Sequence, residues 1–275
     1  MGTQNSRLDA LGLPSAAGWL SGWLKHSFLA VQDYSFLAAR SLTSWLGGPR
    51  YFTDALEQMD IVGVGSLAIV LLTGLFIGGI MVLQTGSQFA RFGQTALTGD
   101  AVALALVREL GPTITGLLVA GRCASGMASE LGSMLVTEQV DAMRAMGTDP
   151  VRKLVVPRVL ATVAMLPLLV VLADFVGLTG GFLVSTFSLR LDPVQFWRRA
   201  LDALEFADLM QGFTKSLIFG FILSTVGCYQ GLSVTGGTEG VGRATTRAVV
   251  VSSVTILVSD LFLTRLALFF AGKGF

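Results

Sequence analysis

The stretch from Ile61 to Leu83 constrains the fold more than any other, because it is apolar throughout and contains no charged residue. A helix that crosses the hydrocarbon core of a membrane needs about 20 mostly apolar residues, and this stretch is long enough. The whole chain has the same character: 52% of its 275 residues are hydrophobic and 13% are charged, whereas about 25% of the residues of a soluble domain are charged. The composition therefore indicates a polytopic membrane protein and argues against a disordered chain or a water-soluble enzyme.

Four further stretches have the length and apolar character of a spanning helix. They are Ala101–Gly121, which contains Arg108 and Glu109, Val159–Leu189, which contains Pro167 and Asp174, Ser216–Val234, and Ala248–Ala271, which contains Asp260 and Arg265. We therefore predict an all-α fold, with a five-helix transmembrane bundle in residues 61–275 and an N-terminal region in residues 1–60. An odd number of spans places the two termini on opposite sides of the membrane.

The positive-inside rule predicts the orientation of the bundle, because cytoplasmic segments near the span ends are rich in Lys and Arg. If the N-terminus is cytoplasmic, the larger group of Lys and Arg residues near the span ends lies inside: Arg7, Lys25, Arg40, Arg50, Arg122, Arg144, Arg152, Lys153, Arg158, Arg243 and Arg247. The smaller group then lies outside: Arg91, Arg190, Arg198, Arg199, Lys215 and Lys273. We predict that the N-terminus is cytoplasmic.

The N-terminal region is predicted to contain an amphipathic helix. Its apolar residues recur at helical spacing and alternate with polar ones: Trp19, Leu20, Trp23, Leu24, Phe28 and Val31. Tryptophans at such positions anchor a helix in the membrane interface. A packed cytoplasmic helix is the alternative interpretation.

Several kinds of chemistry are excluded or disfavoured by what the sequence contains. The formal net charge of +1 gives no electrostatic footprint for a nucleic acid. The single histidine, His26, and the two cysteines, Cys123 and Cys228, provide no metal-ligand cluster and no disulfide framework. The Gly272–Lys273 pair is followed by Gly274, so it is not a P-loop. We therefore expect no catalytic residues, no metal, no cofactor and no ATP hydrolysis by this chain itself.

A short helix is predicted between the second and third spans, over Ser133–Met146. Gly132 precedes it, and Gly147 and Pro150 follow it, which is a natural stop. The charged residues Glu138, Asp141 and Arg144 recur every three residues and share one face. Such a helix either docks in a groove of a soluble partner or rests on its own bundle, and the pattern leaves both interpretations open.

The adjacent charges Arg108 and Glu109 lie inside the second span, just before Pro112. Charges at this depth are costly and face other protein groups or a wet cavity. They line a substrate path or form internal ion pairs that fix helix packing, and Asp174, Asp260 and Arg265 present the same choice. Neighbouring residues project about 100° apart on a helix, so we expect Arg108 and Glu109 to have separate partners.

The end of the first span carries a stripe of apolar and uncharged polar side chains. Its members fall on one helical face, with Phe89 beside them: Met81, Gln84, Thr85, Gln88 and Phe92. The stripe suits acyl chains below a headgroup, although helix packing is the more frequent use of such a pattern. GxxxG spacings at Gly74/Gly78, Gly177/Gly181 and Gly227/Gly231 favour close helix contacts.

Taken in order, several motifs resemble those of the MlaE/YrbE permease family. They are RELGP, VAGR, ELGSMLVTEQVDAM, MGTDP and VPR between residues 108 and 158, followed by GTEGVGRATTRAVV and the last span with Asp260. The resemblance covers nearly the whole chain after about residue 50. It implies the membrane subunit of an MCE-type ABC transporter, which moves phospholipids between an inner membrane and a tunnel of MCE-domain proteins and maintains outer-membrane lipid asymmetry. Relatives of the same family supply lipid to chloroplasts.

The resemblance also implies partners and a location. Two permease copies form a homodimer and pair with two ABC ATPase subunits, an MCE-domain periplasmic protein stands on the far side, and some systems add a STAS-domain subunit. The chain would lie in a bacterial inner membrane.

Two sets of site residues follow from the resemblance. The family's ATPase-coupling helix maps onto Ser133, Met134, Thr137, Glu138, Asp141 and Arg144. The family's lipid cavity maps onto Met81, Gln84, Gln88, Phe89, Phe92, Arg108, Glu109 and Asp260.

Two other classes of protein compete with this interpretation. A secondary transporter or channel could use Glu109, Asp174 and Asp260 as ion or proton sites. A membrane scaffold would transport nothing itself. No inverted repeat, which would favour a secondary transporter, is visible across the five spans.

Overall fold

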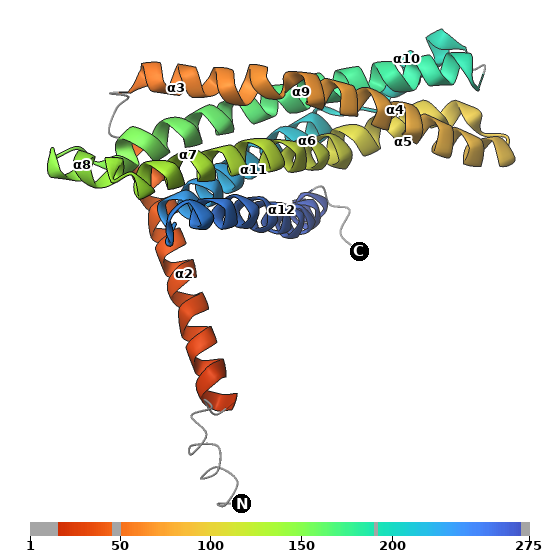
Figure 1. Ribbon diagram of the computed structural model, residues 1–275. Coiled ribbons are helices and arrows are strands. Elements are labelled where there is room, and N and C mark those ends of the chain that lie inside the picture. Colours follow the sequence, from red (N-terminus) through yellow and green to blue (C-terminus); the bar gives the residue numbers. More distant parts are fainter. Residues whose placement is uncertain (1–15, 46–50, 190–191, 271–275) are drawn as a thin grey trace, which may run out of the picture.

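The computed structural model describes residues 16–45, 51–189 and 192–270, and every regular element in these ranges is a helix (Figure 1). The all-α fold class is confirmed. Five helices in the described ranges are long and apolar enough to cross a membrane: Phe52–Arg91, Thr95–Val136, Val151–Phe187, Phe206–Leu232 and Gly237–Phe269. Each overlaps one predicted span, and each begins several residues before it, because polar and charged residues continue the helix beyond the hydrocarbon length.

The first three spans are interrupted by π-helical turns. The first span consists of α3 (Phe52–Met59), η1 (Asp60–Val64) and α4 (Gly65–Arg91). The second consists of η2 (Thr95–Leu97), α5 (Thr98–Ala105), η3 (Leu106–Leu110), α6 (Gly111–Val119), η4 (Ala120–Ala124) and α7 (Ser125–Val136), of which η2 is a 3₁₀ turn. The third consists of η5 (Val151–Val155) and α9 (Val156–Phe187).

The fourth and fifth spans are the single helices α11 (Phe206–Leu232) and α12 (Gly237–Phe270). Among the described residues, three helices lie outside the spans: α2 (Ala16–Trp45), α8 (Gln139–Ala145) and α10 (Pro193–Asp202). The spans run side by side, with α8 at one end of the bundle and α10 at the other (Figure 1). We call these the α8 end and the α10 end.

Glycines allow the first and third spans to pack closely against each other. A Cβ on Gly78 would lie 1.8 Å from the carbonyl oxygen of Gly177, and one on Gly74 would lie 2.8 Å from that of Ala173. The backbones of α4 and α9 are therefore in direct contact, as the GxxxG spacings predict. On the other side of the bundle, α11 packs on α7, and α12 packs on both of them.

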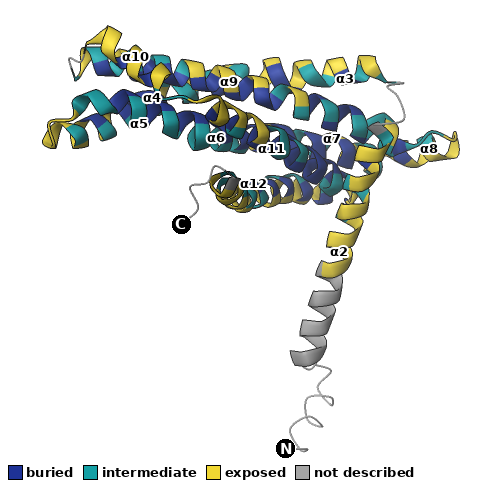
Figure 2. Cartoon of the chain, turned by 180° about the vertical axis from the view of Figure 1, so that it is seen from behind, coloured by how far each residue is buried: buried dark blue, intermediate teal, exposed yellow. Residues whose placement is uncertain are grey.

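The largest apolar core lies between α6, α9, α11 and α12, around Phe219, Leu166, Leu223 and Ile256. The outward surface of the bundle is apolar as well, especially on α12, where Leu261 is 70% exposed. Figure 2 shows exposed residues along the outer faces of α3, α4 and α12 and buried ones between the helices. That distribution suits a bundle solvated by lipid.

Helix α2 extends away from the α8 end at a wide angle to the spans (Figure 1). Its second half touches the bundle: the Tyr34 hydroxyl lies 2.9 Å from Thr225 Oγ1, and its ring meets that of Tyr229 edge-on. Burial raises the pKa of Tyr34, and the hydrogen bond with Thr225 partly opposes that shift. Phe28 is 77% exposed. A helix that projects across the spans at one end is placed to lie in an interface, although the side chains of residues 16–27, with both predicted tryptophan anchors, lie outside the described part.

The predicted helix over Ser133–Met146 is not a single helix. Ser133 and Met134 belong to the last turn of α7, which continues the second span as far as Val136. The chain turns at Thr137 and Glu138, and Glu138 adopts a left-handed conformation with φ of 60°. Only Gln139–Ala145 form the separate helix α8. The sequence pattern does not reveal this turn, because the three-residue spacing of the charged side chains continues through it.

Candidate functional site

A buried lysine in the fourth span gathers charged groups from three spans. Lys215 Nζ lies 2.5 Å from Glu109 Oε2 and 2.7 Å from Asp260 Oδ1. It also donates a hydrogen bond to Thr264 Oγ1 over 2.7 Å. The Lys215 side chain is only 2% exposed, and a buried ammonium is tolerated when carboxylates pair with it.

Both carboxylates have further partners. Glu109 accepts hydrogen bonds from Thr264 at 3.1 Å and from Gln211 at 3.3 Å. Asp260 accepts one from Thr113 at 2.9 Å. Neutral hydroxyl and amide donors therefore complete the coordination of two carboxylates that share one lysine.

The second ion pair of the site joins Arg108 to Asp208. Arg108 Nη2 and Nε both lie 2.6 Å from Asp208 Oδ1. The other oxygen of Asp208 accepts the backbone N–H of Glu205 in a capping box at the start of α11. Arg108 and Glu109 thus have separate partners, as their adjacent positions predict.

The π-helical turn η3 explains this arrangement, since it holds both Arg108 and Glu109 and ends immediately before Gly111 and Pro112. Proline has no N–H to donate, so the regular ladder of helix hydrogen bonds cannot pass through it unchanged. The local π-turn directly before Gly111 accommodates Pro112 at the start of α6.

A cavity of about 450 Å³ lies beside the two ion pairs, between α11 and α12 toward the α10 end. Its polar wall includes Arg108, Asp208, Gln211 and Lys215. Its apolar wall is formed by Met210, Leu263, Leu266, Ala267 and Leu268. One charged wall facing one apolar wall fits a molecule with a polar head and an apolar body.

The structure divides the predicted lipid-contacting residues into two groups. Arg108, Glu109 and Asp260 come together around Lys215. Met81, Gln84, Gln88 and Phe89 lie on α4 and Phe92 directly follows it, and none of the five is among the described residues that line the cavity. Within one chain, the α4 stripe therefore does not line the charged cavity.

Sequence reasoning missed Lys215 and Asp208. It began the fourth span at Ser216 and counted Lys215 as an outside loop residue, whereas α11 begins at Phe206. The available signal was the spacing of Asp208, Gln211 and Lys215, which places three polar side chains on one face of a helix.

The α8 end presents the residues of the predicted coupling site. Thr137, Glu138, Asp141 and Arg144 are exposed, and Arg144 pairs with Asp141 at 2.8 Å. The loop after α8 is tied to α2, because Arg40 Nη2 lies 2.8 Å from Asp149 Oδ2.

Among the described residues, no three His, Cys, Asp or Glu side chains gather as metal ligands. Cys123 and Cys228 are free thiols, and both are buried.

Comparison with known proteins points to one family. The family profile described as "Permease MlaE" matches residues 55–266. A "Probable ABC transporter permease protein" of Synechocystis is 41% identical over 255 residues, covering 93% of this chain and 95% of the relative. The "Intermembrane phospholipid transport system permease protein MlaE" of Haemophilus influenzae is 37% identical over 218 residues, covering 79% and 84%. The chloroplastic protein TRIGALACTOSYLDIACYLGLYCEROL 1 of Arabidopsis thaliana is 37% identical over 238 residues, covering 86% and 67%.

Proposed function

Because the chain belongs to the MlaE permease family, and so is the non-catalytic membrane component of an ABC transporter, we propose that it moves phospholipids between a bacterial inner membrane and an MCE-domain protein. The observation that carries the proposal is the cavity of about 450 Å³ with one charged and one apolar wall. The printed function of the Haemophilus influenzae relative, intermembrane phospholipid transport, supports the same substrate class.

The charges of the cavity suit a phospholipid headgroup. Arg108 is 30% exposed and can meet a phosphate without breaking its pair with Asp208, because a guanidinium has five donors. Asp208, Gln211 and Lys215 line the same wall, and the Lys215 side chain is only 2% exposed. A headgroup phosphate at Arg108, with the acyl chains against the apolar wall, fits this pattern.

Lifting a two-chain lipid out of a bilayer costs about 0.8 kcal/mol per exposed CH₂ group. This cost accounts for an ATP-driven partner. We propose that the partner ATPase docks at the α8 end against Thr137, Glu138, Asp141 and Arg144, with Ser133 and Met134 in the last turn of α7 beside them. A second copy of the chain completes the homodimer, and the MCE-domain protein receives lipid at the α10 end. A STAS-domain subunit would bind the ATPase.

An ion-coupled secondary transporter or channel is less well supported, because two of the three carboxylates it would use, Glu109 and Asp260, are already paired with Lys215. A transported ion would have to displace a lysine that is held by both.

Photo-crosslinking in the assembled transporter tests the proposal. A photoreactive residue at Met210 or Leu266 in the cavity should capture phospholipid in amounts that change when ATP is added. Leu72, which is 56% exposed on the outer face of α4, is the matched control and should capture bulk lipid regardless of ATP. Equal capture at all three positions, with or without ATP, would count against the cavity.

A further inference from the structure

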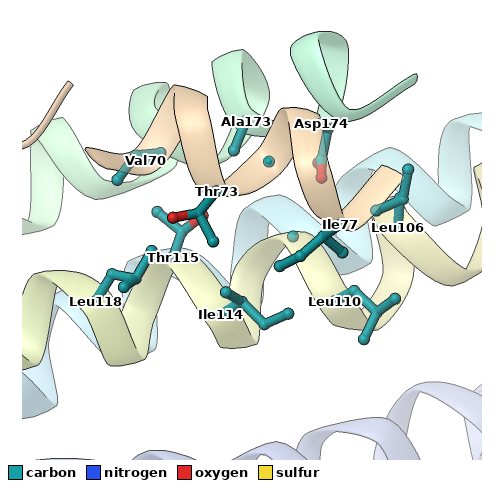
Figure 3. A pocket seen from close by; sticks show the side chains of 12 residues that line it. Val70, Thr73, Ile77, Leu106, Leu110, Ile114, Thr115, Leu118, Ala173 and Asp174 are labelled. Atoms are coloured by element: carbon teal, nitrogen blue, oxygen red, sulfur yellow. The ribbon is translucent and has the colours of Figure 1, made fainter. Parts of the chain in front are cut away.

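A second, smaller cavity lies between α4, α6 and α9, and none of the residues of the charged cluster lines it. Three of the residues that line it carry polar side chains: Thr73 on α4, Thr115 on α6 and Asp174 on α9 (Figure 3). The remaining lining is glycine, alanine and branched aliphatic side chains such as Ile77, Leu110 and Ile114.

None of these three polar side chains has a hydrogen-bond partner among the described residues. Asp174 is 9% exposed, and its Oδ1 is buried without a partner. The hydroxyls of Thr73 and Thr115 make no hydrogen bond within the described part either, although Thr115 is only 2% exposed. Asp174 Oδ1 is thus a buried polar atom without a partner, beside two hydroxyls that are free to bond. This points to a bound molecule, because buried polar groups are nearly always hydrogen-bonded.

The size of the space selects a single water molecule. The cavity has a volume of about 20 Å³, and a site needs roughly 10–15 Å³ by the same measure to hold one water. A carboxyl group and two hydroxyls supply the two to four polar partners that a buried water requires. A metal ion is disfavoured, because hard cations take about six oxygen ligands.

No cation faces Asp174 within the part of the chain that the structure describes. It is the one charged residue that lines the cavity. The described charged residues on the elements around α9 are engaged elsewhere, lie near helix ends or lie on α2 at the α8 end. They are Asp33 and Arg40 on α2, Asp54, Glu57 and Asp60 on α3 and η1, Arg91 on α4, Asp100 on α5, Arg108 and Glu109 on η3, Arg152 and Lys153 on η5, Arg158 on α9, Arg198, Arg199 and Asp202 on α10, and Asp208 and Lys215 on α11. A carboxylate at this depth would be an uncompensated charge in a poor solvent.

We propose that Asp174 is a proton-binding site, at which the neutral carboxyl group shares one water molecule with Thr73 and Thr115. The chemistry is protonation alone: a carboxylate oxygen and a proton form a carboxylic acid, and nothing is oxidised or reduced. Gly111 keeps this site compact, since a Cβ there would lie 1.8 Å from Asp174 Oδ1. The site joins α4, α6 and α9, so a movement that wets the cavity would release the proton.

Infrared spectroscopy of the transporter complex in lipid nanodiscs tests the proposal without measuring transport. The wild type should show the carbonyl stretch of a neutral carboxylic acid, shifted in D₂O. Asp174→Asn, which has the shape of the neutral acid, should remove that band and leave the melting temperature unchanged. Asp260→Asn is the matched control and should leave the band in place. Persistence of the band in Asp174→Asn, or its absence from the wild type, would refute the proton site.

Two further measurements test whether the bound molecule is water or a metal ion. Thr115→Val should shift the carbonyl band by weakening the water bridge, and an unchanged band would refute the shared water. Replacing Na⁺ by a bulky organic cation should change nothing. A band that appears only when Na⁺ is removed would show a carboxylate occupied by a metal ion and overturn the proposal. The wild-type band and its response to Thr115→Val remain decisive if Asp174→Asn fails to fold.

Discussion

At the scale of single residues, Lys215 determines the charge balance of the site. It is one cation between two carboxylates, and its side chain is 2% exposed. Removing one member of a buried ion pair leaves an uncompensated charge and costs about 3–5 kcal/mol. The cost here should fall toward the lower end, because Glu109 is 38% exposed and water partly screens it.

Lys215→Met should therefore lower the stability of the permease substantially, and the triple change Lys215→Met, Glu109→Gln, Asp260→Asn should restore most of the loss. Thermal unfolding in detergent at matched protein concentration measures both effects. If the triple variant is no more stable than the single one, the three charges do not act as one unit.

Arg108 and Glu109 should respond differently to mutation because they have different partners. Arg108→Ala leaves Asp208, whose side chain is 5% exposed, without its cation, whereas Glu109→Ala leaves Lys215 still paired with Asp260. We expect Arg108→Ala to reduce lipid transport strongly, Glu109→Ala to reduce it mildly, and the double variant to resemble Arg108→Ala. Transport assays at matched membrane levels decide the order, and strong rescue of Arg108→Ala by Glu109→Ala would contradict separate roles.

At the scale of helices, the contact between α4 and α9 depends on missing side chains. Gly78→Ala would place a Cβ 1.8 Å from a backbone oxygen of α9, and a backbone cannot move aside as a side chain can. We expect this variant to unfold at a clearly lower temperature than the wild type. Gly126→Ala on α7 is the matched control, because a Cβ there meets nothing within 4 Å, and it should be neutral or stabilising by up to about 1 kcal/mol.

Helix α8 is the element expected to hold the ATPase. Glu138→Lys combined with Asp141→Lys reverses the exposed acidic face, and placing like charges across an interface costs several kcal/mol. Co-purification of the ATPase should fall at least about tenfold, with membrane insertion unchanged. Glu239→Lys is a control at the same end, since Glu239 is an exposed acid paired with Arg243. Undiminished recovery of the ATPase would remove α8 from the interface.

At the scale of the whole molecule, the orientation in the membrane is open to a direct test. Cys123 and Cys228 are buried, so the native thiols should give little background with a membrane-impermeant maleimide. Gln195 on α10 and Gln139 on α8 are exposed and lie at opposite ends of the bundle. With the N-terminus inside, Gln195→Cys should be labelled in cells with a permeabilised outer membrane, and Gln139→Cys only after lysis. The reverse pattern would invert the topology.

The sequence by itself determined the class of the protein, the number of candidate spans and the apolar central part of each. Hydrocarbon is a uniform solvent, so an apolar stretch of sufficient length is informative without knowledge of its neighbours. The GxxxG spacings and the separate partners of Arg108 and Glu109 were predictable for a related reason, because helical geometry places residues on a face before any tertiary contact forms.

Only the tertiary structure decided which charges meet. Glu109, Lys215 and Asp260 come from three spans, and nothing in their spacing along the chain selects that partnership. The tertiary structure also shows that the α4 stripe lies apart from the charged cavity. It shows as well that the second span continues to Val136, whereas the sequence pattern predicts a new helix from Ser133. Asp174 is the clearest case. Its position in the sequence predicts a costly charge inside a span, and only the packing of α4, α6 and α9 shows that no cation among the described residues pairs with it.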